Sequence, residues 1–316
     1  MTRNFTEEYV SINGIEQYFL HIPHDSKDVV IMLHGGPGVP NSYVAYYHQP
    51  YLNFCNVVYY DQRGAGKTRR KNKTKPEELS YDILVEDLKQ TVAYIREKYQ
   101  ADRIFLLGHS CGSLLGTQYI LKHPHDVDGY IGYGQIVNIQ MQEKSWCDYT
   151  KAVVLKSGNQ KDIKKMALVE AAFSKLTREA YLEIAPAISD LECKYGFDAN
   201  GWMAIYKKSP IMSFFRDGPI LLSANKFNRN LLAELYDFDI RAEKNYQVPV
   251  YYILGRYDEW TTSTMAAAYF ETIEAPQKGL HWIENAGHML DIDNPSSFFS
   301  TVKEIICSSL AQYDRT

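Results

Sequence analysis

The most specific chemical signal in the sequence is a serine flanked by glycines, Gly108-His109-Ser110-Cys111-Gly112. It follows a short apolar run, Arg103–Leu107, and precedes a stretch with helical periodicity, Ser113–Lys122. A serine on such a strand-to-helix turn has its hydroxyl exposed at the carboxyl end of a sheet, because glycine neighbours leave room for the turn. The pattern predicts that Ser110 is a nucleophile; the alternative is a structural serine in a glycine-rich turn.

A serine hydroxyl becomes a good nucleophile only when a base accepts its proton. We expect this base to be His288, in a loop after the last predicted strand. His281 is the main competitor, but it lies inside that strand and is expected to pack there. The acid that orients the histidine is predicted to be Asp258, just after another predicted strand. Asp291 and Asp293 come after the histidine in the chain and would break the order Ser, Asp, His. The chain order Ser, Asp, His is that of the α/β-hydrolases.

Acyl transfer also requires two backbone N–H donors that face the developing oxyanion. One donor is predicted to be the amide of Cys111, the residue after the nucleophile. The second is expected in His34-Gly35-Gly36-Pro37-Gly38, where glycines allow the backbone to approach a substrate closely. Without the serine motif, the same segment would be equally typical of a plain Gly/Pro turn.

The composition is that of an ordinary globular enzyme: of 316 residues, 45% are hydrophobic and 23% are charged, and the net charge is -4. There is no basic stripe with interleaved aromatic residues, so we expect no nucleic-acid partner. The N-terminus has no signal-peptide pattern and no apolar run approaches the ~18 residues of a membrane span, so we expect no membrane partner. The five scattered cysteines favour a cytoplasmic location. No metal-ligand spacing is found, and we expect neither a metal nor another cofactor.

Strand-like and helix-like patterns alternate along the chain. The strand-like runs, rich in β-branched and aromatic residues, are Val29–Leu33, Asn56–Tyr60, Arg103–Leu107, Gly129–Tyr133, Pro249–Leu254 and Gly279–Glu284. Helical patterns cover Tyr81–Tyr99, with Ser80 as N-cap, Ser113–Lys122 and Pro295–Gln312. The alternation predicts a mostly parallel sheet with helices on both faces. The Asn13-Gly14 turn signal predicts that the sheet begins with an antiparallel hairpin.

A long segment interrupts this alternation between Gly134 and Pro249, and its more than one hundred residues are too many for a loop. Apolar residues recur there with helical spacing, at Met166, Val169, Ala172, Phe173 and Leu176, and the prolines expected to break the helices are Pro186, Pro210 and Pro219. We therefore predict an α/β-hydrolase core of residues 1–135 and 245–316. Residues 136–244 are predicted to form an inserted helical cap.

Together these motifs resemble the proline iminopeptidase (prolyl aminopeptidase) group of α/β-hydrolases. The segments that carry the resemblance are His34-Gly35-Gly36-Pro37-Gly38, Asp61-Gln62-Arg63-Gly64, the Ser110 turn, Gly255-Arg256-Tyr257-Asp258 and Gly287-His288. The resemblance implies that the second oxyanion donor is the amide of Gly36. It also implies an activity that removes an N-terminal residue, often proline, from short peptides, and that holds the substrate's free amine with glutamates.

Two residues bear on how that amine would be bound. Glu259 follows the expected triad aspartate, as in the tricorn-interacting aminopeptidases, where this glutamate binds the amine. That subgroup has a second glutamate in an Asn-Glu-Phe segment of the cap, whereas the corresponding segment here is Asn225-Lys226-Phe227. If Lys226 lines the pocket, its charge would repel an ammonium group and attract a carboxylate.

We therefore expect a serine hydrolase that cleaves an amide or ester bond of a small molecule or short peptide through an acyl-enzyme, and that resembles proline iminopeptidase. An alternative enzyme is a carboxylesterase or amidase of a non-peptide metabolite, such as an acidic one that Lys226 would face. A third interpretation is a non-catalytic ligand-binding protein on a hydrolase fold, although such proteins usually lack an intact triad. The oligomeric state stays open.

Overall fold

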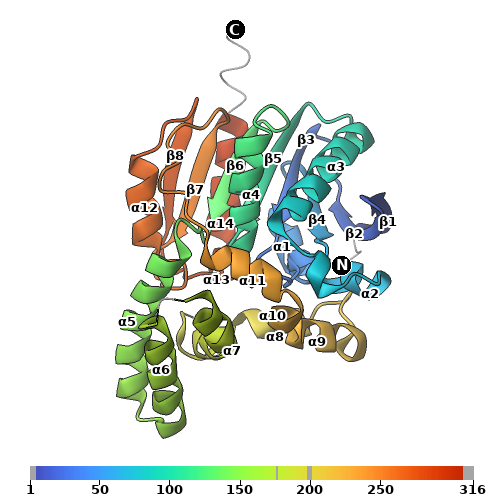
Figure 1. The fold of residues 1–316 in the computed structure, drawn as a ribbon. Helices are drawn as coiled ribbons and strands as arrows, with labels where there is room; N and C mark the ends of the chain where they lie inside the picture. Colours follow the sequence, from blue (N-terminus) through green and yellow to red (C-terminus); the bar gives the residue numbers. More distant parts are fainter. Residues whose placement is uncertain (1–4, 176, 198–200, 309–316) are drawn as a thin grey trace.

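The computed structural model describes residues 5–175, 177–197 and 201–308. These residues form one eight-stranded sheet, with the strand order β1-β2-β4-β3-β5-β6-β7-β8 (Figure 1). β2 is antiparallel to β1 and β4, and the other neighbouring strands are parallel. The strands are β1 (Thr6–Ile12), β2 (Ile15–Ile22), β3 (Asp28–Leu33), β4 (Asn56–Asp61), β5 (Arg103–His109), β6 (Gly129–Tyr133), β7 (Val250–Gly255) and β8 (Lys278–Ile283).

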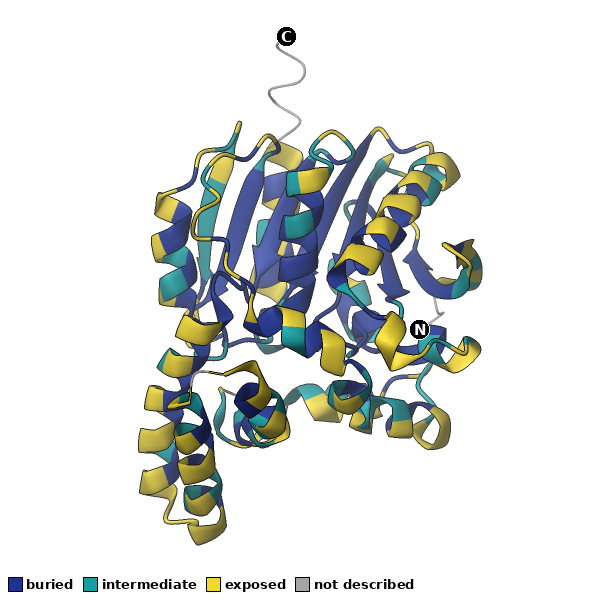
Figure 2. Ribbon diagram, viewed as in Figure 1, coloured by how far each residue is buried: buried dark blue, intermediate teal, exposed yellow. Residues whose placement is uncertain are grey.

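The continuous apolar runs of the central strands follow from burial on both faces of the sheet (Figure 2). In β3, Val29 and Ile31 face one hydrophobic core, while Val30 and Met32 face the other. Helices α3 (Tyr81–Tyr99), α4 (Cys111–Lys122) and α12 (Ser263–Glu271) cover the first face, and α1 (Ala45–His48) and α14 (Pro295–Ser308) cover the second (Figure 1). The predicted α/β-hydrolase architecture is confirmed.

Local signals also predicted the ends of several elements. Asn13 and Gly14 both have positive φ, 44° and 77°, and they form the turn of the expected β1–β2 hairpin. The Ser80 hydroxyl caps α3 by accepting a hydrogen bond from the Ile83 amide at 3.2 Å. The expected final helix is described as far as Ser308, and its predicted end at Gln312 lies outside the described residues.

Between β6 and β7, the described residues form seven helices, which lie at the end of the sheet where β5 and β6 finish (Figure 1). They are α5 (Ile139–Ser157), α6 (Gln160–Phe173), α7 (Arg178–Tyr195), α8 (Gly201–Lys207), α9 (Phe214–Leu222), α10 (Ala224–Phe227) and α11 (Arg229–Tyr236). α5, α6 and α7 share a hydrophobic core of their own around Trp146, Val169 and Leu191. We call residues 139–236 the helical insertion.

Two of the prolines expected to break helices do not do so. Pro186 stands within α7 and Pro219 within α9. A proline removes one backbone hydrogen bond, and a helix held by packing on its neighbours tolerates that loss. In α6 the predicted buried face is present at Met166, Val169 and Ala172, whereas Leu176 lies outside the described residues.

Short segments complete the structure. They are α2 (Gly66–Lys71), α13 (Leu290–Asp293) and the 3₁₀ turns Asn41–Val44, Gln49–Tyr51 and Pro76–Glu78. None of the helices in the described part of the chain combines the length and the apolar composition that crossing a membrane requires.

Candidate active site

Ser110 occupies the tight turn between β5 and α4. Its backbone is strained, with φ 51° and ψ -122°, and α4 begins at the next residue, Cys111. Only a glycine fits at position 112, because a Cβ there would lie 2.0 Å from the carbonyl oxygen of Leu33. The sequence thus bends the chain so that the Ser110 side chain is partly exposed at the carboxyl end of the sheet.

The two expected oxyanion donors lie beside this serine. Cys111 is the first residue of α4, so its amide is free of the helical hydrogen-bond ladder. The loop after β3 passes close to the nucleophile, since a Cβ at Gly35 would lie 2.8 Å from the Ser110 Cβ. Gly36 and Cys111 line the same cavity as Ser110. Burial raises the pKa of the Cys111 thiol to about 12, which keeps the sulfur protonated.

Asp258 and His288 form a buried acid–histidine pair. The His288 Nδ1 lies 3.0 Å from Asp258 Oδ2, and the Thr261 hydroxyl donates to the same oxygen at 2.8 Å. The amides of Trp260 and Thr261 donate to the other oxygen, Oδ1, at 3.0 and 3.1 Å. Burial would raise the pKa of Asp258, but the His288 ring and the Thr261 hydrogen bonds outweigh it and hold the pKa below its ordinary value.

Aromatic rings fix the position of His288. Trp260 and His109 pack against its ring, with centroids 4.8 and 4.7 Å away. The His109 Nε2 lies 3.0 Å from the carbonyl oxygen of His288, and burial lowers the pKa of His109 to about 4, so that its ring is neutral. Among the described residues, no hydrogen bond joins Ser110 Oγ to the His288 ring. Such contacts are often long without substrate, and both side chains face one cavity.

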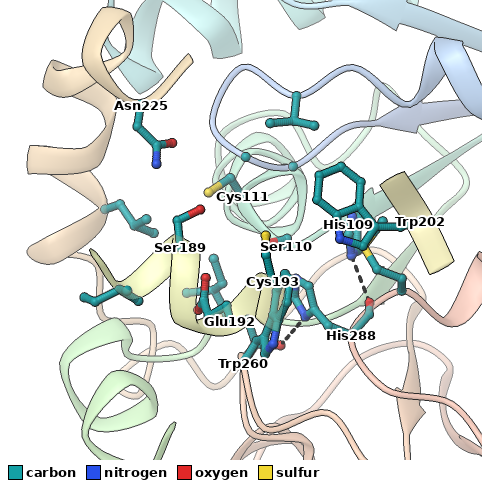
Figure 3. Close-up of a pocket in the computed structure, with 18 of the residues that line it drawn as sticks. His109, Ser110, Cys111, Ser189, Glu192, Cys193, Trp202, Asn225, Trp260 and His288 are labelled. Carbon is teal, nitrogen blue, oxygen red and sulfur yellow. Dashed lines mark hydrogen bonds between the residues drawn. The ribbon is translucent and has the colours of Figure 1, made fainter. Parts of the chain in front are cut away.

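The cavity has a volume of about 190 Å³ and lies between the sheet and the helical insertion. In Figure 3, Glu192 and Ser189 lie on one side of Ser110, and Trp202 lies on the other. The insertion also contributes an apolar wall, made of Ile139, Ala185, Ile188, Leu232 and Leu235. None of the described lining residues is a lysine or an arginine.

Two carboxyl groups of the insertion, Glu143 on α5 and Glu192 on α7, face this cavity. Burial raises the pKa of Glu143 to about 8, and the Tyr181 hydroxyl, 3.3 Å from its Oε1, opposes that rise. Glu143 Oε2 has no hydrogen-bond partner among the described residues. Burial and the neighbouring charges of Glu143 and Asp258 raise the pKa of Glu192 well above its ordinary value. Both groups are therefore placed to ionise when a cation enters.

Neither of the two residues expected to bind substrate lines this cavity. Lys226 is exposed on α10 and does not line the cavity; Asn225 does (Figure 3). Successive helical residues point about 100° apart, so Lys226 faces outward when Asn225 faces inward. Glu259 is partly buried but also lies outside the cavity lining, because the turn after Asp258 presents Trp260 and Thr261 instead.

Glu143 is the site residue that sequence reasoning missed. The spacing of the sequence could have indicated it, because Glu143 lies on the same face of α5 as the buried residues Ile139, Trp146 and Thr150. A glutamate on a buried helix face is rare unless it has a partner or a function. The structure places Glu192 in the cavity, whereas Glu234 accepts a hydrogen bond from the Tyr81 amide at 2.8 Å and does not line it.

Comparisons with known proteins show which family and which structures this chain is similar to. A family model described as serine aminopeptidase, S33, matches residues 24–295. The chain is 25% identical to the probable aminopeptidase YbaC of Bacillus subtilis (strain 168), over 94% of this chain and 92% of that protein. It is also 25% identical to a proline iminopeptidase of Heyndrickxia coagulans, over 96% and 99%. A crystal structure of a proline iminopeptidase of Mycobacterium smegmatis has the same fold, with a TM-score of 0.71, 17% identity, and 97% and 100% coverage.

Proposed function

The chain belongs to the serine aminopeptidase family S33, and on that premise we propose that Ser110 is its nucleophile, His288 its base and Asp258 the acid that orients the base. The support is positional: Ser110 stands at a strained turn, and the Asp258–His288 pair faces the same cavity. The protein is a hydrolase that resembles the proline iminopeptidases.

The proposed reaction proceeds through an acyl-enzyme. Ser110 Oγ attacks the substrate carbonyl carbon while His288 Nε2 accepts the hydroxyl proton. The negative oxygen of the tetrahedral intermediate accepts hydrogen bonds from the amides of Gly36 and Cys111. The scissile bond then breaks, and the leaving group takes the proton from His288. A water molecule, deprotonated by His288, attacks the acyl-enzyme and releases the acid and free Ser110.

Charge in the cavity carries the proposal for the substrate. Glu143 and Glu192 face the cavity, and no described lining residue carries a permanent positive charge. Ionising these buried carboxyls is costly unless a cation meets them, and a substrate ammonium group supplies that cation. We therefore propose a short peptide or small amide with a free N-terminal amine as the substrate, with residues 136–244 as a cap over it. The names of the relatives, aminopeptidase and proline iminopeptidase, agree with this class.

The other interpretations have less support. The interpretation as an esterase or amidase of an acidic metabolite depended on Lys226, but this residue is exposed and does not line the cavity. A ligand-binding protein without catalysis would not need the Asp258–His288 pair beside a strained serine. The five cysteines, four of them at least partly buried, are free, which fits the reducing cytoplasm as the proposed location. We propose no nucleic-acid partner and no cofactor.

The test is a matched substrate panel. The purified protein is assayed with prolyl and alanyl amides of aminomethylcoumarin, their N-acetylated forms, and an acetyl ester without an amine. We expect the free-amine amides to have a kcat/KM at least about tenfold above the N-acetylated forms, because only they can pair with the carboxyls. The variant Ser110→Ala should lose turnover of all substrates and labelling by a fluorophosphonate. Equal rates with N-acetylated amides would contradict the amine proposal, and labelling of Ser110→Ala would contradict the nucleophile.

A further inference from the structure

Helix α9 turns its apolar side to solvent. Phe215, Pro219 and Leu222 stand at positions i, i+4 and i+7, so they share one face of the helix, and all three are exposed. The exposed fractions of Phe215 and Leu222 are 89% and 91%, and Phe214 beside them is 68% exposed. The opposite face holds Asp217, whose side chain is buried. This is the reverse of an ordinary surface helix, whose apolar face is buried.

Polar contacts with α2 hold α9 in this orientation. Arg70 forms an ion pair with the buried carboxylate of Asp217. Arg69 donates to the carbonyl oxygen of Ile220 at 3.3 Å and to the Ser223 hydroxyl at 3.1 Å. Leu221 also packs against the hydrophobic cluster of Tyr43 and Tyr206. Because these contacts fix the inner side of α9, the outward orientation of Phe215 and Leu222 is built into the fold.

The exposed charges of α9 and of the segments next to it in the sequence are all positive. Residues 201–230 contain five cations and one acid, and the acid is Asp217, which is buried and paired with Arg70. The cations are all exposed, and none of them pairs with an acid among the described residues: Lys207, Lys208, Arg216, Lys226 and Arg229. The whole chain has a net charge of -4, so the positive charge is local to this segment. A partner with an anionic surface and an apolar interior would match both the exposed apolar side chains of α9 and the positive charge near them.

We propose that α9 is a docking surface for an anionic lipid bilayer, with Phe214, Phe215 and Leu222 inserting among the acyl chains and the five cations facing lipid phosphates. The sequence analysis expects no membrane partner because no apolar run in the sequence is long enough to span a bilayer, but binding at the bilayer surface needs no such run. α8 and α10 flank α9 and contribute Trp202, Tyr206 and Asn225 to the cavity. Docking would therefore bring the helices on both sides of α9, and the cavity they line, close to the bilayer. The proposal does not depend on which bond the enzyme cleaves.

Vesicle co-sedimentation of the full-length protein tests the proposal. Vesicles of phosphatidylglycerol and phosphatidylcholine are compared with vesicles of phosphatidylcholine alone. We expect the protein to bind the anionic vesicles, and raising the salt from about 0.1 to 0.5 M to weaken binding by screening. Phe215→Ser with Leu222→Ser should weaken binding about tenfold or more through lost apolar contact. Lys207→Glu with Arg216→Glu should have an effect of similar size through charge reversal.

Control variants on α6 match these substitutions in type. Leu168 is 68% exposed and Lys161 and Lys164 are exposed there, so Leu168→Ser and the two Lys→Glu changes alter similar groups on a different surface. These variants should bind vesicles as the wild type does, and all variants should retain the circular dichroism of the wild type. Absent binding, unchanged binding by the α9 variants, or equal binding to neutral vesicles would overturn the proposal. A wild-type dimer that Phe215→Ser with Leu222→Ser converts to a monomer, without vesicle binding, would instead make this face an interface between two copies.

Discussion

Glu143 offers the sharpest test of how the cavity recognises its substrate, because its carboxyl must ionise to bind an ammonium group. Burial raises its pKa to about 8, so the carboxyl is mostly protonated at neutral pH and becomes ionised as the pH rises. A substrate α-amine, with a pKa of about 8, has the opposite dependence and loses its charge as the pH rises. The product of the two charged fractions is greatest near pH 8. It falls towards more acidic and more alkaline pH.

The change to make is Glu143→Gln, which keeps the shape of the side chain and removes its charge. A hydrogen bond to a charged group contributes about 1.5–3 kcal/mol, so we expect kcat/KM for a free-amine amide to fall by about 10- to 150-fold. Turnover of an acetyl ester without an amine should change by less than about threefold, since that substrate makes no such contact. Glu259→Gln is the matched control, because Glu259 has a raised pKa but does not line the cavity.

The assay is the ratio of kcat/KM for a prolyl amide to that for the ester, measured from pH 6 to 10. Taking the ratio cancels ionisations that both substrates share, such as that of the catalytic base. For the wild type and for Glu259→Gln, this ratio should have a maximum near pH 8. For Glu143→Gln, the ratio should be low and should show no maximum. If Glu143→Gln kept the maximum and Glu259→Gln lost it, Glu259 would be the amine ligand and the argument from the cavity would be wrong.

Three further predictions follow from the site. His288→Ala should lower turnover by several orders of magnitude with an unchanged circular dichroism spectrum, whereas His281→Ala, in β8, should stay near the wild type; the reverse result would make His281 the base. Lys226→Glu should change kcat/KM for free-amine amides by less than about twofold, and a large gain would place residue 226 at the cavity. The raised pKa of Glu143 means that the folded state keeps a proton the unfolded chain releases, so this group lowers the free energy of unfolding as the pH rises from about 4.5 to about 8. In urea denaturation, the free energy of unfolding should fall less between pH 5 and pH 8 for Glu143→Gln than for the wild type. An equal fall in the two proteins would contradict the raised pKa of Glu143.

The sheet and the reactive loops could be predicted because their signals are local. A strand buried on both faces appears as a continuous apolar run, as in Val29–Leu33, and the run alone marks its position. The Ser110 turn needs glycines within two residues, and that requirement is visible in the sequence. The order of Ser110, Asp258 and His288 follows from the order of the strands that precede them.

The residues of the helical insertion could not be placed in the same way. Whether a residue of α10 faces the cavity depends on the rotation of the helix about its axis. A shift of one position would put Lys226 in the cavity in place of Asn225, and this would change the charge inferred for the site. Glu143 and Glu192 are 49 positions apart, and only the packing of α5 against α7 brings both to the cavity. The packing of one helix against another cannot be predicted from local patterns in a single sequence.

The different origins of these groups imply that reaction and selectivity can vary separately. The proposed nucleophile, base and acid stand in loops fixed by β5, β7 and β8, whereas the carboxyls that would select an amine come from α5 and α7. A change of helix rotation or of one insertion residue can therefore alter the charge of the cavity while the Asp258–His288 distance of 3.0 Å is preserved. Substitutions of Glu143 and Glu192 should then act on substrates that carry an amine, while turnover of a substrate without one continues to report only on the groups held by the sheet.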